Sequence, residues 1–207
     1  MKIKFLFLLL LAVPAYSQIN VSFFAGMNPA TNLIARDRSG FLDSYWSTGF
    51  NLSVVTEVFV SRSVAIAPSV EYARYAFDNY AFQGVSIPEV RFKSATGEAS
   101  NIWRMFAEAR FFTNSSKAVP WYFSTGLGYF IERIGTISAT YTDMSGPDFT
   151  RAINYQGKNF FVHTVGLGIR WSAFSRLALD LNAQYFTNYN DRLHTAVKMG
   201  VVYSVVE

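Results

Sequence analysis

Residues 64–72 read VAIAPSVEY, and this stretch contains the pattern that decides the fold. Every second residue is large and apolar, namely Val64, Ile66, Pro68, Val70 and Tyr72. The residues between them are small, polar or charged, namely Ala65, Ala67, Ser69 and Glu71. Successive side chains of a β-strand point to opposite faces. The stretch therefore predicts a strand with one apolar face and one small or polar face.

The same alternation recurs along the chain and predicts eight strands. They lie at about 19–27, 45–58, 64–77, 102–112, 121–132, 159–171, 176–186 and 193–205, bounded by clusters of Gly, Pro, Asn, Asp or Ser. Ordinary strands have about 5–6 residues, whereas a tilted strand that crosses a membrane needs about 9–11. Beyond the N-terminal segment, no window has the roughly 18 uninterrupted apolar residues of a transmembrane helix.

Two architectures fit strands with one apolar face. A soluble sandwich or ligand-binding barrel turns that face inward, and a membrane barrel turns it outward to lipid. The connections favour the second, because long ones near 28–44, 78–101 and 133–158 alternate with short ones at 59–63, 113–120 and 172–175. Outer-membrane barrels have short periplasmic turns and longer external loops. The sequence therefore predicts an eight-stranded antiparallel up-and-down transmembrane β-barrel, in which only the last external connection, 187–192, is short.

Aromatic residues gather at the predicted strand ends. If the first strand rises from the periplasm, an outer girdle is expected from Trp46, Tyr72, Trp103, Tyr129, Phe161 and Tyr185. An inner girdle is expected from Phe59, Phe111, Trp121, Trp171 and Tyr203. Amphipathic rings prefer the membrane interface, and two girdles are typical of such barrels. The alternative, ordinary core aromatics, does not explain the spacing.

The polar faces carry charges that nearly cancel, and these predict a network inside the barrel. Its members are Glu57, Glu71, Arg104, Glu108, Arg110, Glu132, Arg170, Asp180 and Lys198. Charges enclosed in a barrel have to be paired, because an unpaired buried charge is very costly. We expect Asp180 opposite Lys198, and Glu71 and Glu108 close to Arg104 or Arg110.

Residues 1–17, MKIKFLFLLLLAVPAYS, are typical of a secretory signal peptide. Lys2 and Lys4 form the basic region, an apolar run follows, and Ala15-Tyr16-Ser17 is a small-x-small cleavage site. The mature domain would then be 18–207. A buried first helix is the alternative, but it does not explain why the basic start and the cleavage site occur together.

The composition excludes several classes of protein. Half of the 207 residues are apolar (51%) and only 15% are charged, which excludes a disordered chain. Without Lys2 and Lys4, 16 basic residues face 14 acidic ones, a balance that argues against nucleic-acid binding. The chain has no Cys, which excludes disulfides, thiolate metal sites and a cysteine nucleophile.

Candidates for catalysis are few, and no cofactor or metal site is expected. His163 and His194 lack the spacing of a zinc site. We expect His163 on the lipid face and His194 at the outer rim, where a nearby Ser could form a hydrolase pair. No G-x-S-x-G elbow accompanies it. The glycine pairs at 126/128 and 166/168 lack the third glycine of a nucleotide loop, and we expect them to leave room on the lumen face.

The long loops contain candidates for ligand binding, because function on rigid scaffolds concentrates in loops. These candidates are Arg36, Asp37, Arg38, Phe41, Leu42, Asp43, Tyr80, Phe82, Phe92, Tyr141, Asp143, Asp148, Phe149 and Tyr155. The alternative is that the strands continue as ribbons beyond the membrane. The stretch VSIPEVRFK has an alternation of its own that fits this alternative.

Two stretches resemble a known family. GFNLSVVTEVFVSRSVAIAPSVEY is a strand, a tight turn with Ser61 and Arg62, and a second strand, and PWYFSTGLGYF is an aromatic-led strand with paired glycines. Both resemble the small outer-membrane β-barrel domains of the OmpA/OmpX type, over about residues 18–207. The resemblance implies a location in the outer membrane of a Gram-negative-type cell, with outer-membrane lipid and the barrel-assembly machinery as partners. It indicates the fold far better than the role.

Four functions remain open at this stage. The first is a non-enzymatic barrel with a closed lumen that supports membrane integrity or binds an unknown ligand through its external loops. The second is a narrow channel for small solutes, and the third is a lipid-modifying outer-membrane enzyme. The fourth is a soluble secreted barrel that binds an apolar ligand.

Overall fold

The computed structural model describes residues 18–28, 46–80, 82, 90–113, 119–143, 146–154, 156–187 and 193–206, without the side chains of residues 193, 194 and 206. The predicted signal peptide at 1–17 lies outside these residues. So do the loop candidates from Arg36 to Asp43, together with Tyr155 and the side chain of His194.

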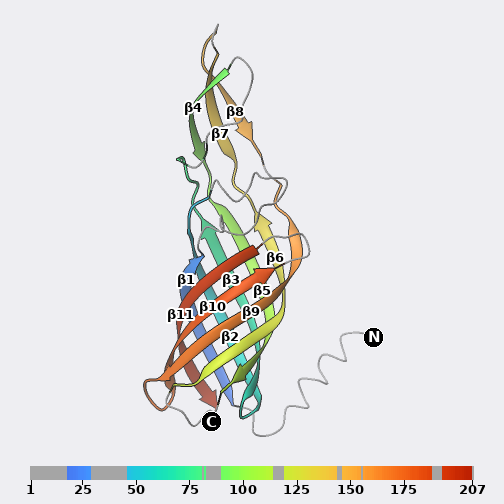
Figure 1. Ribbon diagram of the computed structural model, residues 1–207, viewed down its shortest axis with the longest axis vertical. Helices are drawn as coiled ribbons and strands as arrows, with labels where there is room; N and C mark the ends of the chain where they lie inside the picture. Colours follow the sequence, from blue (N-terminus) through green and yellow to red (C-terminus); the bar gives the residue numbers. More distant parts are fainter. Residues whose placement is uncertain are drawn as a thin grey trace, which may run out of the picture.

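Eight strands form a closed antiparallel barrel, seen in the lower part of Figure 1. They are β1 (Ile19–Asn28), β2 (Gly49–Ser61), β3 (Val64–Tyr75), β5 (Ser100–Phe112), β6 (Trp121–Arg133), β9 (Asn159–Ser172), β10 (Leu177–Thr187) and β11 (Leu193–Val206). Their order is β1-β11-β10-β9-β6-β5-β3-β2, and the pairing of β1 with both β2 and β11 closes the ring. Closure satisfies the backbone groups of both edge strands. The predicted eight-stranded antiparallel barrel is confirmed.

The apolar face of the strands points outward. Phe161 is 73% exposed, Met199 64% and Phe23 63%, whereas the alternate residues of the same strands are buried. A soluble protein rarely exposes a continuous apolar band of this kind. The barrel therefore has the exterior of a transmembrane barrel of the outer-membrane type. The alternative of a soluble barrel with its apolar face inward is wrong for this chain.

The two ends of the barrel differ. One end, here called the turn end, carries the connections 62–63, 113–120 and 173–176 together with the start of β1 and the end of β11. The opposite loop end carries the long connections. Because short turns are periplasmic in this architecture, the turn end corresponds to the periplasmic side.

A second, three-stranded sheet projects beyond the loop end (Figure 1). It contains β4 (Val90–Gly97), β7 (Ile137–Asp143) and β8 (Phe149–Ile153), in the order β4-β7-β8. The alternation within VSIPEVRFK thus continues into a real strand, β4. Parts of the long connections, which were expected to be binding loops or ribbons continued beyond the membrane, thus form an ordered sheet.

The projecting sheet has an apolar core of its own. Phe82 and Tyr141 are each 1% exposed, and Phe92 packs on both at ring-centroid distances of 5.6 and 5.9 Å. The interpretation of these three rings as exposed binding residues is wrong, because they hold the sheet together. Tyr80, in contrast, is 97% exposed.

Candidate functional site

The lumen of the barrel is filled by charged side chains. It brings together eight of the nine residues expected there: Glu57, Glu71, Glu108 and Asp180 with Arg104, Arg110, Arg170 and Lys198. None of the eight is more than 7% exposed. Four acids and four bases leave this group with no net formal charge. They form two ion-pair clusters, one toward each end of the barrel.

The cluster nearer the loop end is built around Glu71. Arg104 Nη1 lies 2.5 Å from Glu71 Oε1, and Lys198 Nζ lies 2.7 Å from Glu71 Oε2. Arg104 also donates to Asn28 Oδ1 at 3.0 Å and to the Tyr75 hydroxyl at 2.8 Å. Glu71 and Arg104 lie directly opposite one another on β3 and β5. The carboxylate therefore forms ion pairs with two cations supplied by two different strands.

The cluster nearer the turn end is built around Arg170. Its Nη1 and Nη2 bind the two oxygens of Glu57 at 2.9 and 2.7 Å, and its Nε and Nη2 bind Asp180 Oδ2 at 2.9 and 2.7 Å. Arg110 Nη1 adds a contact to Glu57 at 2.7 Å, and the Tyr122 hydroxyl donates to Asp180 at 2.8 Å. A bidentate arginine–carboxylate pair is among the strongest charge-assisted hydrogen-bond arrangements.

Glu108 occupies the space between these clusters. Its Oε1 accepts hydrogen bonds from Thr164 at 2.9 Å and from Gln184 at 2.6 Å. Its Oε2 lies 3.4 Å from Arg110 Nη2 on the same strand. The polar residues of β9 and β10 thus continue the network across the barrel.

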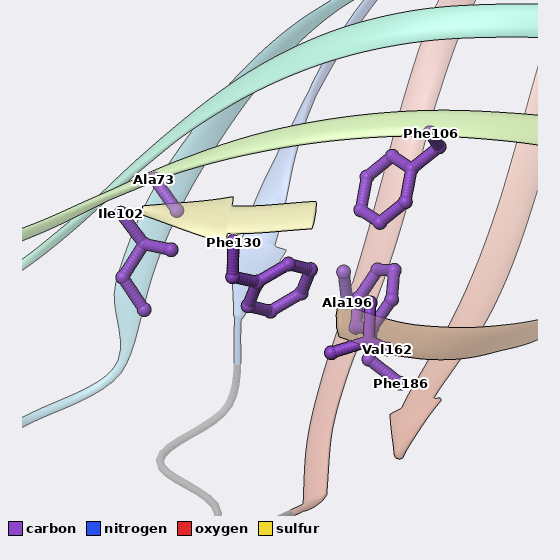
Figure 2. Packing of buried hydrophobic residues seen from close by; sticks show 7 residues of the cluster. All are labelled: Ala73, Ile102, Phe106, Phe130, Val162, Phe186 and Ala196. Carbon is purple, nitrogen blue, oxygen red and sulfur yellow. The ribbon is translucent and has the colours of Figure 1, made fainter. Parts of the chain in front are cut away.

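A layer of aromatic rings packs inside the lumen beside Arg104. Figure 2 shows Phe106, Phe130 and Phe186 converging from β5, β6 and β10. Their ring centroids are 5.2–5.7 Å apart, and the Arg104 guanidinium lies over Phe130 and Phe186 at 4.9 and 5.0 Å. Such cation–π contacts add to the ion pairs that hold this arginine.

The lumen glycines make room for large rings. A Cβ at Gly128 would lie 2.3 Å from the Phe106 ring, and one at Gly168 would lie 2.2 Å from the Tyr122 ring. The expectation that these glycines leave space is met at both positions. The neighbours that fill the space are aromatic rings.

Most of the predicted girdle residues point outward. At the outer rim, Tyr72 packs on Trp103 and Tyr129 packs on Phe161, each pair at a centroid distance of 5.0 Å. Tyr185 lies on the same outward face of β10. At the turn end, the exposed outward rings are Phe111, Trp121, Trp171 and Tyr203.

Two placements differ from the sequence analysis. Trp46 is 8% exposed, bridges Phe77 and packs in the core of the projecting sheet, because β2 begins only at Gly49. Phe59 packs inside the turn end against Phe112 at 5.3 Å, on the same side of β2 as Glu57. Neither ring belongs to a lipid-facing girdle.

Glu132 differs from the other predicted network acids. It is half-buried at the loop end of β6, on the same face as Gly128 and Phe130, and lies within electrostatic range of Tyr75. Its membership in the lumen network stays a prediction.

The expected pair of Asp180 with Lys198 is also wrong. The strands β10 and β11 continue to Thr187 and Leu193, so that Tyr185 pairs with Thr195 and Asp180 lies opposite Gly200. The shift of two residues keeps both charges in the lumen but gives each a different partner.

Several lumen residues were not identified from the sequence. They are Asn20, Asn28, Tyr75, Phe106, Tyr122, Phe130 and Phe186. Their position in the two-residue period could have identified them, since Phe106 lies midway between Arg104 and Glu108. The period alone gave no reason to select the aromatic ones, because the lumen face was expected to carry small, polar or charged residues.

The projecting sheet carries a charged contact on its surface. Lys93 binds Asp148, which also accepts a hydrogen bond from Thr142 Oγ1 at 2.8 Å. The hydrogen bonds from Lys93 and Thr142 lower the pKa of Asp148 below its ordinary value. This contact fixes the chain just before β8 to β4 and β7.

Metal sites and membrane-spanning helices are both absent from the described residues. There, no group of three or more His, Cys, Asp or Glu side chains is placed to hold a metal ion. No helix in the same part of the chain is long and apolar enough to cross a membrane. His163 lies on the outward face of β9, as expected.

Comparison with known proteins gives matches among solved structures alone. No protein-family model matches the chain, and no curated protein matches it significantly. Neisserial surface protein A matches at 14% identity with a TM-score of 0.49, over 90% of this chain and 96% of that one. A major outer membrane protein of Thermus thermophilus matches at 12% identity and a TM-score of 0.49, over 91% and 99%. The N-terminal barrel domain of Pseudomonas aeruginosa OprF matches at 10% and 0.47, over 90% and 96%.

Proposed function

We propose that this protein is a non-conducting, non-enzymatic barrel of the outer membrane, which contributes to membrane integrity and holds a sheet for binding at the cell surface. The observation that carries the proposal is the neutral, buried network of four acids and four bases across the lumen. An eight-stranded barrel is only just wide enough for its own side chains. Here those side chains are paired with one another.

Opening a path through this lumen would require the separation of ion pairs. Moving Arg170 aside would break its contacts with both Glu57 and Asp180. The two buried carboxylates would then have neither this ion-pair partner nor solvent to stabilise their charges. Breaking such a buried pair is strongly unfavourable. The aromatic layer of Phe106, Phe130 and Phe186 adds a second obstacle nearer the loop end. Both features support a closed barrel.

The projecting sheet is the part that we assign to surface binding. One face presents hydroxyl groups in register, since Thr140 lies opposite both Ser94 and Thr150, and its Oγ1 lies 3.2 Å from that of Thr150. Exposed Thr96 and the Lys93–Asp148 pair extend the polar surface. Such a face suits a polar ligand, and its own apolar core keeps it ordered.

Planar-bilayer recording tests the closed lumen. The refolded protein should give no discrete conductance steps. A variant that removes both obstacles should conduct, with Phe106→Ala and Phe130→Ala in the aromatic layer and Glu57→Ser and Arg170→Ser in the cluster at the turn end. The variant is the positive control, because its conductance shows that the assay detects inserted barrels. Discrete, ion-selective steps from the unaltered protein would refute the closed barrel and favour the narrow channel.

Surface binding needs its own test, on polysaccharide arrays with the protein in nanodiscs. Replacing Thr96, Thr140 and Thr150 by Ala should abolish any binding that the unaltered protein shows. A matched control replaces Ser61, Ser172 and Ser175 at the turn end. Binding that survives the sheet variant would remove the sheet from the proposal.

A further inference from the structure

The turn end of the barrel contains a cavity that the closed lumen does not explain. Its volume is about 340 Å³, and it lies between the start of β1, the turn after β2 and the turn between β9 and β10. The innermost charged group in its lining is Arg170. The cavity thus lies on the periplasmic side of the ion-pair network.

The charged residues that line this cavity are all positive. Three arginines line it, Arg62, Arg170 and Arg176, and none of its described lining residues is Asp or Glu. Arg170 is held by Glu57 and Asp180. Arg62 and Arg176 are exposed on the two turns, and within the described residues neither guanidinium has a hydrogen bond or ion pair. Two free guanidinium groups therefore border one concave surface.

The rest of the lining is suited to an organic molecule. Phe59, Phe112 and Phe174 contribute apolar surface, and Asn20 and Ser204 contribute polar groups. Phe174 is 74% exposed, so its ring is accessible from the periplasmic side. Small-molecule sites typically combine apolar walls with a few placed polar or charged groups. The volume exceeds that of a bare phosphate several-fold, given that one water occupies about 30 Å³ in the liquid.

We propose that this cavity binds an oxyanion, a phosphate or carboxylate group attached to an apolar or aromatic body, with Arg62 and Arg176 as its anchors. The planar guanidinium fork matches the oxygens of both groups. The neutral network behind Arg170 offers no net charge to draw the anion deeper, so the ligand stays at the mouth. The oxyanion could come from a soluble periplasmic molecule or from a lipid headgroup of the inner leaflet.

Isothermal titration of the full mature chain in zwitterionic micelles tests the site, with inorganic phosphate and phenyl phosphate as probes. We expect saturable binding of both, with phenyl phosphate at least threefold tighter because its ring can contact Phe174. Arg62→Gln combined with Arg176→Gln should weaken binding at least tenfold. The matched control, Arg133→Gln with Arg151→Gln, removes two charges at the loop end and should leave affinity unchanged. Heat-modifiable migration on gels verifies folding of each variant.

The outcomes separate the possibilities. If the protein shows no saturable binding, the proposed site is wrong. An equal loss of affinity in both double variants would also overturn it, because that result reflects net charge alone. Phosphatidylglycerol and phosphatidylcholine nanodiscs then identify the source. Weaker phenyl phosphate binding in phosphatidylglycerol indicates that the lipid headgroup competes for the arginines, and equal affinity indicates a soluble ligand. Neither result depends on whether the barrel conducts.

Discussion

The pair of Glu71 and Lys198 offers the sharpest test of the lumen network. Glu71 accepts from Arg104 at 2.5 Å and from Lys198 at 2.7 Å, and all three side chains are at most 4% exposed. Glu71→Gln leaves two buried cations without their carboxylate, and we expect a loss of about 3–5 kcal/mol in the free energy of unfolding. Lys198→Met should cost less, because Arg104 still neutralises Glu71.

A double-mutant cycle isolates the contact. The variant with both changes should be less destabilised than the sum of the single variants, by roughly 0.5–3 kcal/mol. Urea unfolding in phospholipid vesicles, followed by tryptophan fluorescence, measures each free energy. Tyr122→Phe with Lys198→Met is the control, since Tyr122 bonds to Asp180 in the other cluster, and its effects should add within about 0.5 kcal/mol. Additivity of Glu71→Gln and Lys198→Met, or a larger coupling of Lys198 to Asp180, would refute the network as described.

Three further predictions concern the facing of the strands, the lumen glycines and the projecting sheet. Leu167→Arg should impair assembly into vesicles, because a charge on the lipid face costs about 2–4 kcal/mol at the midplane, and Leu167→Phe should not; equal gel-shift yields for the two would show that the residue does not face lipid. Gly128→Ala should lower the free energy of unfolding by about 1–3 kcal/mol, since its Cβ would lie 2.3 Å from Phe106. Adding Phe106→Leu should restore part of the lost stability. An unchanged midpoint of urea unfolding in Gly128→Ala would contradict the close approach of the Phe106 ring. The lowered pKa of Asp148 means that the contact with Lys93 stabilises the sheet at pH values above the ordinary Asp pKa of 3.8 and loses that effect as the pH falls through the lowered value; Lys93→Gln should raise the Asp148 pKa in an NMR titration, and no change would exclude the contact.

Strand existence and facing follow from the sequence because both depend on a local rule. The two-residue period assigns each side chain of a strand to one face, whichever strand lies beside it. It correctly placed Val70, Leu167 and Val201 outward and Glu71, Arg170 and Lys198 inward. A shift of register by an even number of residues leaves these assignments intact, which explains why they survived the wrong pairing of Asp180 with Lys198.

Partner identity in the lumen does not follow from the same rule. The expected contact of Asp180 with Lys198 failed because two extra residues in the pairing of the strands move it by a full period. Charges also reach across the barrel to strands that are not neighbours. Lys198 on β11 binds Glu71 on β3, and Arg170 on β9 binds Glu57 on β2. Only the diameter and closure of the barrel bring those pairs together.

The ends of the strands also show which features the sequence determined and which the tertiary structure decided. The sequence determined that aromatic rings cluster at the strand ends, yet two of them do not face lipid. Trp46 precedes the start of β2 and packs in the core of the projecting sheet. Phe59 shares the lumen side of β2 with Glu57, because both lie on one face in the two-residue period. The sequence by itself thus determined the strands, their two faces, the charged composition of the lumen and the direction of the apolar surface, all of which depend on a period of two. The tertiary structure alone decided the ion-pair partners, the projecting sheet and the arginine-lined mouth, because these depend on register and on distances between segments far apart in the chain.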